Sequence, residues 1–365
     1  MVLDIITALF LLLGFVLFYK TKTLHRKPLQ NRRKLSIIIP ARNEEINIAS
    51  LLSGLKNEKH LIYEIIVVND GSKDKTEDIA KSFGAKVVNI DRHPLDWKGK
   101  NFACFTGAKH AFGDILLFLD ADLIPQEHMV EKLQSNYRVG TVLSVAPYHY
   151  TEKVYEQLSL FFNTISIAAV GVCLPGKDKG IGLFGPVLMM DKSLYFDFGG
   201  HELVKNEVIE DYQLGMLLRK EGIVRDLFLG YGSISYQMYK GGLSDLIWGW
   251  SKNFAGAALK TPFAYLLSVF LWIMSYYYVA IGLIQNSIIY FNKTVDIQVT
   301  LLYILLYLLA GTLLYCNVRK LGKFTLLSCI FYIIPLSAFT FIFALSFVLK
   351  FIAKKVRWKG RWLKI

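Results

Sequence analysis

Cysteine is scarce in this chain and follows no recognisable pattern. The four cysteines are Cys104, Cys173, Cys316 and Cys329, and no two of them have the Cys-x-x-Cys spacing of a redox or metal site. A disulfide scaffold and a structural zinc site are therefore not indicated. We expect these residues to be small buried hydrophobic side chains in a reducing compartment.

The common nucleotide-binding loops are also missing. No G-x-G-x-x-G sequence follows the first predicted strand, which excludes a typical NAD-binding fold, and no Walker A sequence is present. The chain has no internal repeat and no low-complexity stretch. It carries a formal net charge of +13 but no nucleic-acid-binding motif.

Charge is sparse as well, and long apolar runs take its place. Charged residues make up 19% of the chain and hydrophobic ones 53%, which is too apolar for an ordinary soluble domain. A helix needs about 20 mostly apolar residues to cross a bilayer. The candidate spans are Val2–Phe18, Phe263–Tyr290, Val299–Tyr315 and Phe324–Val348. They predict a transmembrane anchor at 1–20, a membrane region at 263–350 and a basic tail at 351–365.

Basic residues follow the first apolar run instead of preceding it, which favours an uncleaved anchor over a signal peptide. Since Lys and Arg collect on the cytoplasmic side of membrane segments, residues 35–261 are predicted to form a cytoplasmic domain of a multi-pass cell-membrane protein. The basic stretch between Lys20 and Lys34 either marks topology alone or also attracts anionic lipid headgroups.

The topology of the C-terminal region has two solutions. The loop around Arg319 and the tail after Lys350 are both basic, yet Phe324–Val348 is long enough for only one crossing. Either the tail breaks the positive-inside rule, or the segment turns back near Pro335 as a hairpin. We favour the hairpin.

Between these membrane regions, short strands and helices alternate. Continuously apolar strands alternating with helices indicate an α/β domain with a mostly parallel sheet covered on both faces. The predicted strands are Leu35–Pro40, Tyr63–Val68, Ala85–Ile90 and Asp114–Leu119. The predicted helices are Glu45–Lys56, Thr76–Phe83 and Asn101–Ala111.

Polar residues stand where these strands end, at the edge where such sheets bind ligands. Asp120 and Asp122 follow a buried strand one residue apart. They present the hard oxygen ligands that Mg²⁺ or Mn²⁺ takes together with substrate phosphates. Alone, the pair is a weak signal, and a plain loop with a helix-capping Asp is the favoured interpretation. The upstream polar strand ends, Arg42–Glu44 and Asn69–Asp70, favour the metal site.

Taken together, these motifs resemble family 2 glycosyltransferases of the Rossmann-like GT-A fold, over about Leu35–Ala257. The stretches that carry the resemblance are Ile39–Glu45, Val68–Ser72 with Asp74 and Thr76, Asp120–Asp122, and Glu210–Asp211. The C-terminal part resembles staphylococcal-type carotenoid (4,4'-diaponeurosporenoate) glycosyltransferases. The supporting stretches there are Phe184–Pro186, Gly199–His201, Met238–Tyr239 with Gly242, Gly249–Lys252 and Trp358–Arg361.

The resemblance implies a nucleotide-sugar site. Pro40, Arg42 and Glu44 would line the nucleoside pocket and Asp70 would bind uracil. Asp120 would contact ribose or diphosphate, and Asp122 the metal. Singly, Glu44 is equally well a helix-start acid and Asp70 a turn residue.

Three lysines are candidates for the donor diphosphate. Lys98 and Lys100 flank a glycine just before a helix, where a diphosphate is readily bound; a solvated loop is the competing interpretation. By the resemblance, Lys252 would reach the diphosphate from the C-terminal side.

The resemblance also assigns a catalytic base and an acceptor side. Asp211 would deprotonate the acceptor hydroxyl, which implies inversion at the anomeric carbon. The alternative is that Glu210 and Asp211 only cap the following helix. Glu210, His201 and Trp250 are weaker candidates for the acceptor side.

The acceptor is expected to be hydrophobic. The Gln-x-x-Arg-Trp sequence of processive polymerases is absent, which indicates addition of a single sugar, with UDP-glucose the expected donor. Tyr155–Leu174 is predicted to be an interfacial helix beside the acceptor. A carotenoid acid or alcohol, a diacylglycerol and a polyprenyl phosphate remain open as acceptors, and an inactive membrane scaffold is the non-enzymatic alternative.

Overall fold

The computed structural model describes residues 2–29, 33–174, 180–207, 209–291, 297–353, 355–358 and 361–364. Its contacts divide the chain into two compact units. We call them the sheet unit, made of Thr21–His149 and Gly176–Gln237, and the helical unit, made of Met1–Lys20, Tyr150–Pro175 and Met238–Ile365. Residues 150–175 and 238–261 thus group with the apolar helices, whereas the sequence placed them in the 35–261 domain.

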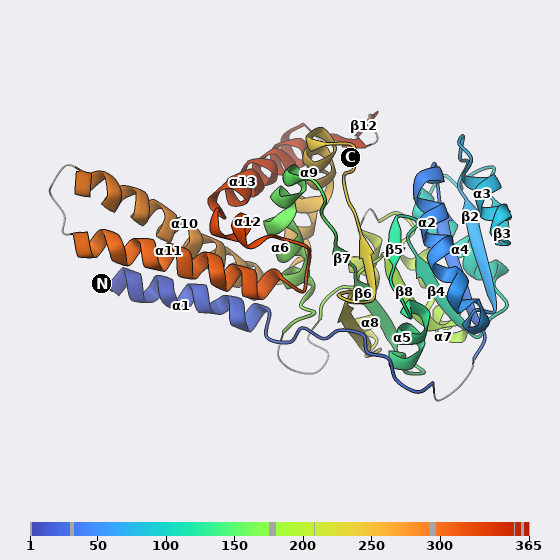
Figure 1. Ribbon diagram of the computed structural model, residues 1–365. Helices are drawn as coiled ribbons and strands as arrows, with labels where there is room; N and C mark the ends of the chain where they lie inside the picture. The colour runs from blue at the N-terminus through green and yellow to red at the C-terminus, as the bar shows by residue number, and fades with distance from the viewer. Residues whose placement is uncertain are drawn as a thin grey trace. The chain divides into compact units, whose positions relative to one another are not determined.

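A seven-stranded sheet forms the centre of the sheet unit, in the order β3-β2-β1-β4-β8-β6-β9 (Figure 1). Its strands are β1 (Leu35–Ala41), β2 (Glu64–Asn69), β3 (Lys86–Asn89), β4 (Ile115–Leu119), β6 (Val142–Ala146), β8 (Val187–Asp191) and β9 (Arg225–Leu229). The pairings β3–β2, β2–β1 and β1–β4 are parallel, as predicted. Strand β8 is antiparallel to both of its neighbours.

A second, small sheet and six helices make up the rest of this unit as far as its residues are described. The small sheet pairs β5 (Leu123–Pro125), β10 (Ile234–Tyr236) and β7 (Tyr148–His149). The helices are α2 (Glu45–Leu55), α3 (Thr76–Ser82), α4 (Gly99–His110), α5 (Met129–Asn136), α7 (Lys192–Phe198) and α8 (Glu210–Lys220), with the short 3-10 turns η1 (Lys56–Leu61) and η3 (Gly200–Val204).

Helices cover both faces of the parallel strands, as the unbroken apolar pattern predicted. Ile37 and Ile39 point to one face and belong to the same buried cluster as the apolar side of α2. Ile38 points to the opposite face because side chains alternate along a strand. There α4 approaches so closely that a Cβ on Gly107 would lie 2.4 Å from Ile38 Cγ2. Glycine at position 107 therefore permits the close packing of α4 on β1.

Among its described residues, the helical unit contains three helices long and apolar enough to cross a membrane: Phe263–Ile288, Ile297–Val318 and Ile333–Ile352. This is consistent with a membrane protein. The unit comprises α1 (Val2–Leu17), η2 (Val154–Ser159), α6 (Leu160–Val170), α9 (Leu243–Lys260), α10 (Phe263–Phe291), α11 (Ile297–Val318), α12 (Leu326–Ile330), α13 (Ile333–Phe347), the single turn η4 (Val348–Ile352) and the hairpin strands β11 (Lys355–Trp358) and β12 (Arg361–Lys364). Helix α1 packs beside α10 and α11 (Figure 1). With 16 residues it is shorter than a full span, so its role as an anchor stays a prediction.

The helical path breaks near Pro335, between the end of α12 at Ile330 and the start of α13 at Ile333. The hairpin itself stays a prediction. Pro335 lies in the first turn of α13, where its missing N–H removes no helical hydrogen bond.

The predicted interfacial helix is a core helix of the helical unit. Its helical part, α6, is buried at nearly every position and packs against α10 and α13. A helix lying on a membrane surface exposes a polar face, and α6 exposes none. Lys177 and Lys179, which follow it in the sequence, lie outside the described residues.

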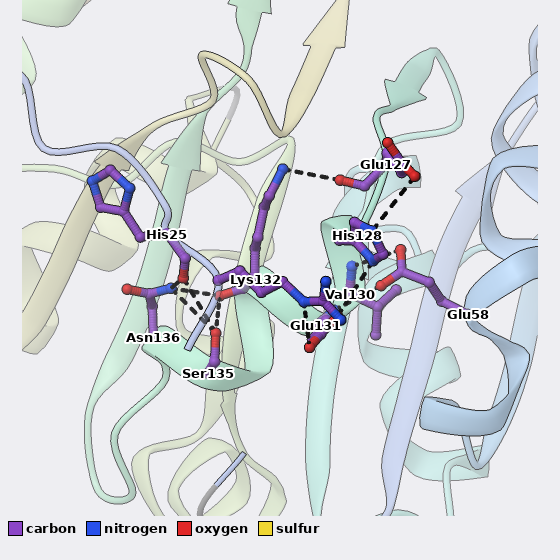
Figure 2. Close-up of polar contacts among 10 residues, drawn as sticks. His25, Glu58, Glu127, His128, Val130, Glu131, Lys132, Ser135 and Asn136 are labelled. Atoms are coloured by element: carbon purple, nitrogen blue, oxygen red, sulfur yellow. Dashed lines mark hydrogen bonds and ion pairs between the residues drawn. The ribbon is translucent and has the colours of Figure 1, made fainter. Parts of the chain in front are cut away.

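The basic segment after α1 is tied to the sheet unit by acidic partners. Arg26 Nε donates to Glu131 Oε1 at 2.8 Å, and the carbonyl of His25 accepts from Asn136 Nδ2 at 2.6 Å (Figure 2 shows His25, Glu131 and Asn136). Lys22 pairs with Asp226 in the same way. These charges are therefore partly neutralised by protein, which leaves fewer of them for lipid headgroups than the sequence suggested.

Candidate active site

The loops that follow β1 and β2 interlock through a set of side-chain hydrogen bonds. Asn43 adopts the left-handed backbone conformation, with φ of 55°, which asparagine tolerates better than most residues. Its N–H donates to Ser72 Oγ at 3.1 Å, and its Oδ1 accepts from the N–H of Lys73 at 2.8 Å. The N–H of Glu44 donates to Thr76 Oγ1 at 2.8 Å. The two strand ends are thus held together, as the parallel sheet implied.

Asp70 lies at this junction and contacts two basic side chains. Its Oδ2 is 3.6 Å from Arg42 Nη1, and its Oδ1 accepts from His93 Nε2. The Asp70 side chain is 10% exposed, so it stays reachable for one further hydrogen-bond donor. Pro40, at the end of β1, pairs in register with Val68 on β2, one residue before the strand end at Asn69.

Lys100 bridges two acidic residues from distant parts of the chain. From the first turn of α4, its Nζ donates to both Asp120 oxygens at 2.8 and 2.9 Å and lies 3.3 Å from Glu210 Oε1. Although burial acts to lower the pKa of Lys100, these two carboxylates raise it well above its usual value. Lys100 is thus paired with two carboxylates of the protein. The sequence had predicted the donor diphosphate as its partner. Lys98 precedes it as an exposed side chain.

Replacing Lys100 by methionine is expected to destabilise the sheet unit. It leaves the Asp120 and Glu210 carboxylates close together without their shared cation. Because the Lys100 side chain is 37% exposed, we expect a loss of about 1–2 kcal/mol, below the roughly 3–5 kcal/mol of a fully buried pair. Thermal unfolding in detergent measures this, with Lys98→Met as the exposed control. Equal shifts for both variants would contradict the bridging role.

Asp122, the predicted metal ligand, lies close to two other carboxylates, Asp120 and Glu44. Burial, together with the nearby Asp120 and Glu44 carboxylates, raises the pKa of its carboxyl to about 6. Such crowding of oxygen ligands favours a bound cation. Among the described residues, no group of three or more His, Cys, Asp or Glu side chains forms a complete metal cage. The carboxylates of Asp120 and Asp122 fit Mg²⁺ or Mn²⁺, because these ions take one or two carboxylates together with substrate phosphates.

Asp211 lies in the first turn of α8, with both oxygens fixed by backbone donors. Its Oδ2 accepts from the N–H of Gly185 and its Oδ1 from the N–H of Tyr212, each at 2.8 Å. A Cβ on Gly185 would lie 3.0 Å from Asp211 Oδ2, so glycine permits this approach. Burial raises the pKa of Asp211, and the hydrogen bonds and Lys100 only partly oppose the rise. The result is an oriented carboxylate with increased affinity for a proton.

Asn101 positions this region and was missed as a functional residue. It is buried on α4, and its Nδ2 lies within hydrogen-bond distance of three carbonyls in the segment that leads toward α8: Val204, Lys205 and Glu207. An asparagine inside a helix start is only a weak signal in a sequence, because its partners lie about 100 residues away.

The weaker acceptor-side candidates lie in different places. His201 is 4% exposed and packs between Phe118 and Tyr195, whose hydroxyl bonds its Nδ1. Burial lowers the pKa of His201 to about 3, as for a neutral core histidine. Trp250 belongs to the helical unit, stacks on Phe162 and donates to Ser159 Oγ. The side chain of Lys252 lies outside the described residues.

Comparison with known proteins points to one family. Residues 36–183 match the profile of glycosyl transferase family 2. The chain is 34% identical over 279 residues to the 4,4'-diaponeurosporenoate glycosyltransferase of Staphylococcus haemolyticus, covering 73% of this chain and 74% of that protein. It is 33% identical over 280 residues to the enzyme of the same name from Staphylococcus aureus, covering 74% of each chain.

One solved structure is similar along nearly the whole length. The mannosyltransferase PcManGT from Pyrobaculum calidifontis, in complex with GDP-Man and Mn²⁺, superposes with a TM-score of 0.54 at 14% identity. The match covers 96% of this chain and 95% of that one. At this identity the likeness concerns the fold.

Proposed function

Since this chain belongs to the family 2 glycosyltransferases, we propose that it moves a single sugar, glucose, from a UDP-sugar to a lipid-like acceptor. The observation that supports this most is the grouping of Asp120, Asp122 and Asp211 around Lys100, with Asp70 beside Gly99 at the start of the same helix. It gives a single site the means to bind a donor and to accept a proton.

In this proposal the donor lies along the ends of β1, β2 and β4. Pro40, Arg42 and Glu44 line the nucleoside pocket, and Asp70 accepts a hydrogen bond from the base. Asp120 contacts the ribose or diphosphate, while Lys98 binds phosphate oxygens. Before the donor arrives, Lys100 holds Asp120 in place and limits the repulsion between Asp120 and Glu210.

Asp122 would hold Mg²⁺ or Mn²⁺, with phosphate oxygens completing the coordination. When bound, the cation neutralises negative charge on the departing nucleoside diphosphate. The Mn²⁺ in the structurally similar mannosyltransferase supports a divalent cation at such a site.

Asp211 acts as the base in the transfer step. The acceptor hydroxyl oxygen bonds to the anomeric carbon, the bond from that carbon to UDP breaks, and the hydroxyl proton passes to Asp211. Attack from the side opposite to UDP turns an α-linked donor into a β-linked product. The direct test of this outcome is to isolate the lipid product and determine its sugar count and anomeric configuration. A chain of sugars or an α-linkage would contradict the proposal.

Two arguments bear on the chemical class of the acceptor, and they favour different functional groups. The relatives named for a carotenoid acid support a carotenoid carboxylate. A carboxylate is already ionised at neutral pH and needs no base, whereas the fixed position of Asp211 suits a hydroxyl, as in a carotenoid alcohol or diacylglycerol. Polyprenyl phosphate, like the acid, offers no proton to remove. We place the reaction at the cytoplasmic face of the membrane that α10, α11 and α13 would cross.

Activity toward a hydroxyl acceptor should fall at low pH. Asp211 serves as a base only when it is ionised, and burial raises its pKa above the usual aspartate value. Protonation therefore removes activity as the pH falls through this raised pKa, and activity is regained above it. The measurement is kcat against pH with saturating donor and metal. A profile that stays flat down to the ordinary aspartate pKa of about 3.9 would contradict the assignment.

A further inference from the structure

Among the residues that the structure describes, one histidine, His93, contacts the proposed nucleobase carboxylate. It lies in the loop between β3 and α4, and its Nε2 donates to Asp70 Oδ1. The edge of its ring packs against Phe102, with 5.6 Å between ring centroids. Its side chain is 29% exposed, while its Nδ1 is buried and has no hydrogen-bond partner among the described residues. The contact with Asp70 is thus the polar interaction that fixes the ring.

The second oxygen of Asp70 is constrained from other elements. Arg42, from the loop after β1, lies 3.6 Å from Oδ2. The start of α4 is so close that a Cβ on Gly99 would lie 2.8 Å from the same atom. The carboxylate is therefore held in one orientation by three separate segments, although it is ionisable and could rotate in an open pocket.

The loop that carries His93 is itself anchored. The N–H of Lys98 donates to the carbonyl of Lys205 at 2.8 Å, and Lys205 Nζ pairs with Asp96. Trp97 packs its ring against Phe102 and Phe105. Surface ion pairs contribute little to stability on their own. Stability alone therefore does not account for this anchoring. We attribute it to the ligand of Asp70, because the anchored loop fixes the imidazole of His93 against that carboxylate.

We propose that His93 is a positioning residue for nucleobase selection, an inference that rests on the proposed function. By donating to Oδ1, His93 orients the Asp70 carboxylate. The oxygens of Asp70 then face the base only as hydrogen-bond acceptors. Such a carboxylate pairs with the ring N–H of uracil or guanine. It repels the ring nitrogen lone pair that cytosine and adenine present at the corresponding position. The donor class is therefore a nucleotide with a ring N–H beside a carbonyl.

Calorimetric titration of the full chain in detergent tests this, using UDP, CDP and GDP with Mn²⁺. The wild-type protein is expected to bind UDP or GDP at least about 10-fold more tightly than CDP. His93→Ala should weaken the preferred nucleotide about 10-fold and leave CDP nearly unchanged, because CDP depends on the phosphate contacts alone. His93→Gln keeps an N–H near the Nε2 position and should restore most of the preference. His60→Ala, at an exposed histidine of the same unit, is the matched control.

The outcomes separate this inference from the proposed function. If the wild-type protein prefers UDP or GDP but His93→Ala keeps that preference, or loses affinity for all three nucleotides equally, His93 has no selective role. If the wild-type protein binds none of the nucleotides, the proposed function fails and the inference fails with it.

Discussion

Asp211→Asn is expected to reduce transfer to a hydroxyl acceptor by about 10²–10⁴-fold, the range that a general base contributes. The substitution keeps the size of the side chain but removes its ability to take a proton. The amide can accept only one of the two backbone hydrogen bonds from Gly185 and Tyr212, so a small loss of stability should accompany the loss of rate. The measurement is kcat with a purified hydroxyl acceptor, beside the affinity for UDP, which should change little.

The same variant separates the acceptor classes. With a carboxylate or phosphate acceptor, no proton has to be removed, and Asp211→Asn should retain most of its activity. Glu210→Gln is the matched control, since it neutralises the adjacent carboxylate and leaves Asp211 in place. If Glu210→Gln loses as much activity on a hydroxyl acceptor as Asp211→Asn, the base is not Asp211.

Asp122→Ala should abolish the dependence of the reaction on divalent metal. A cation that neutralises a leaving diphosphate contributes several kcal/mol to the transition state, which corresponds to about 10²–10⁴-fold in rate. We expect UDP release to fall by that order and UDP affinity to become insensitive to Mn²⁺. Both are measured by titrating metal into wild-type and variant protein.

Asp78→Ala provides the control for this variant, because Asp78 is an exposed carboxylate on α3 within the same unit. It should leave metal dependence as in the wild type. A metal response in Asp122→Ala that matches that of Asp78→Ala would show that the cation is held elsewhere.

The sheet could be predicted from the sequence because its strands are short, continuous apolar runs. A run such as Ile37–Ile39 is readable since both of its faces are buried. The same apolar pattern showed where the strands end. Arg42 and Asp70 were therefore predicted to lie at the same edge of the sheet. Strand β8 was not foreseen, because its place between β4 and β6 depends on an antiparallel pairing about 70 residues away in the chain.

The details of the site depended on tertiary contacts that no local pattern records. Lys100 was expected to face a diphosphate, yet its nearest charges are Asp120 and Glu210. His201 was a candidate for the acceptor side, but the Phe118 and Tyr195 rings enclose it. His93 carried no motif, and its contact with Asp70 is visible only in the folded chain.

Donor turnover by the full chain tests the central claim most directly. The measurement is UDP release in detergent from UDP-glucose, with Mn²⁺ and a membrane lipid extract, for the wild-type protein, Asp122→Ala and Asp211→Asn. The account predicts metal-dependent release by the wild-type protein, lost in Asp122→Ala, together with a lipid that gains the mass of one hexose. No release from any UDP-sugar, by a protein that also binds no UDP, would contradict it and favour an inactive membrane scaffold.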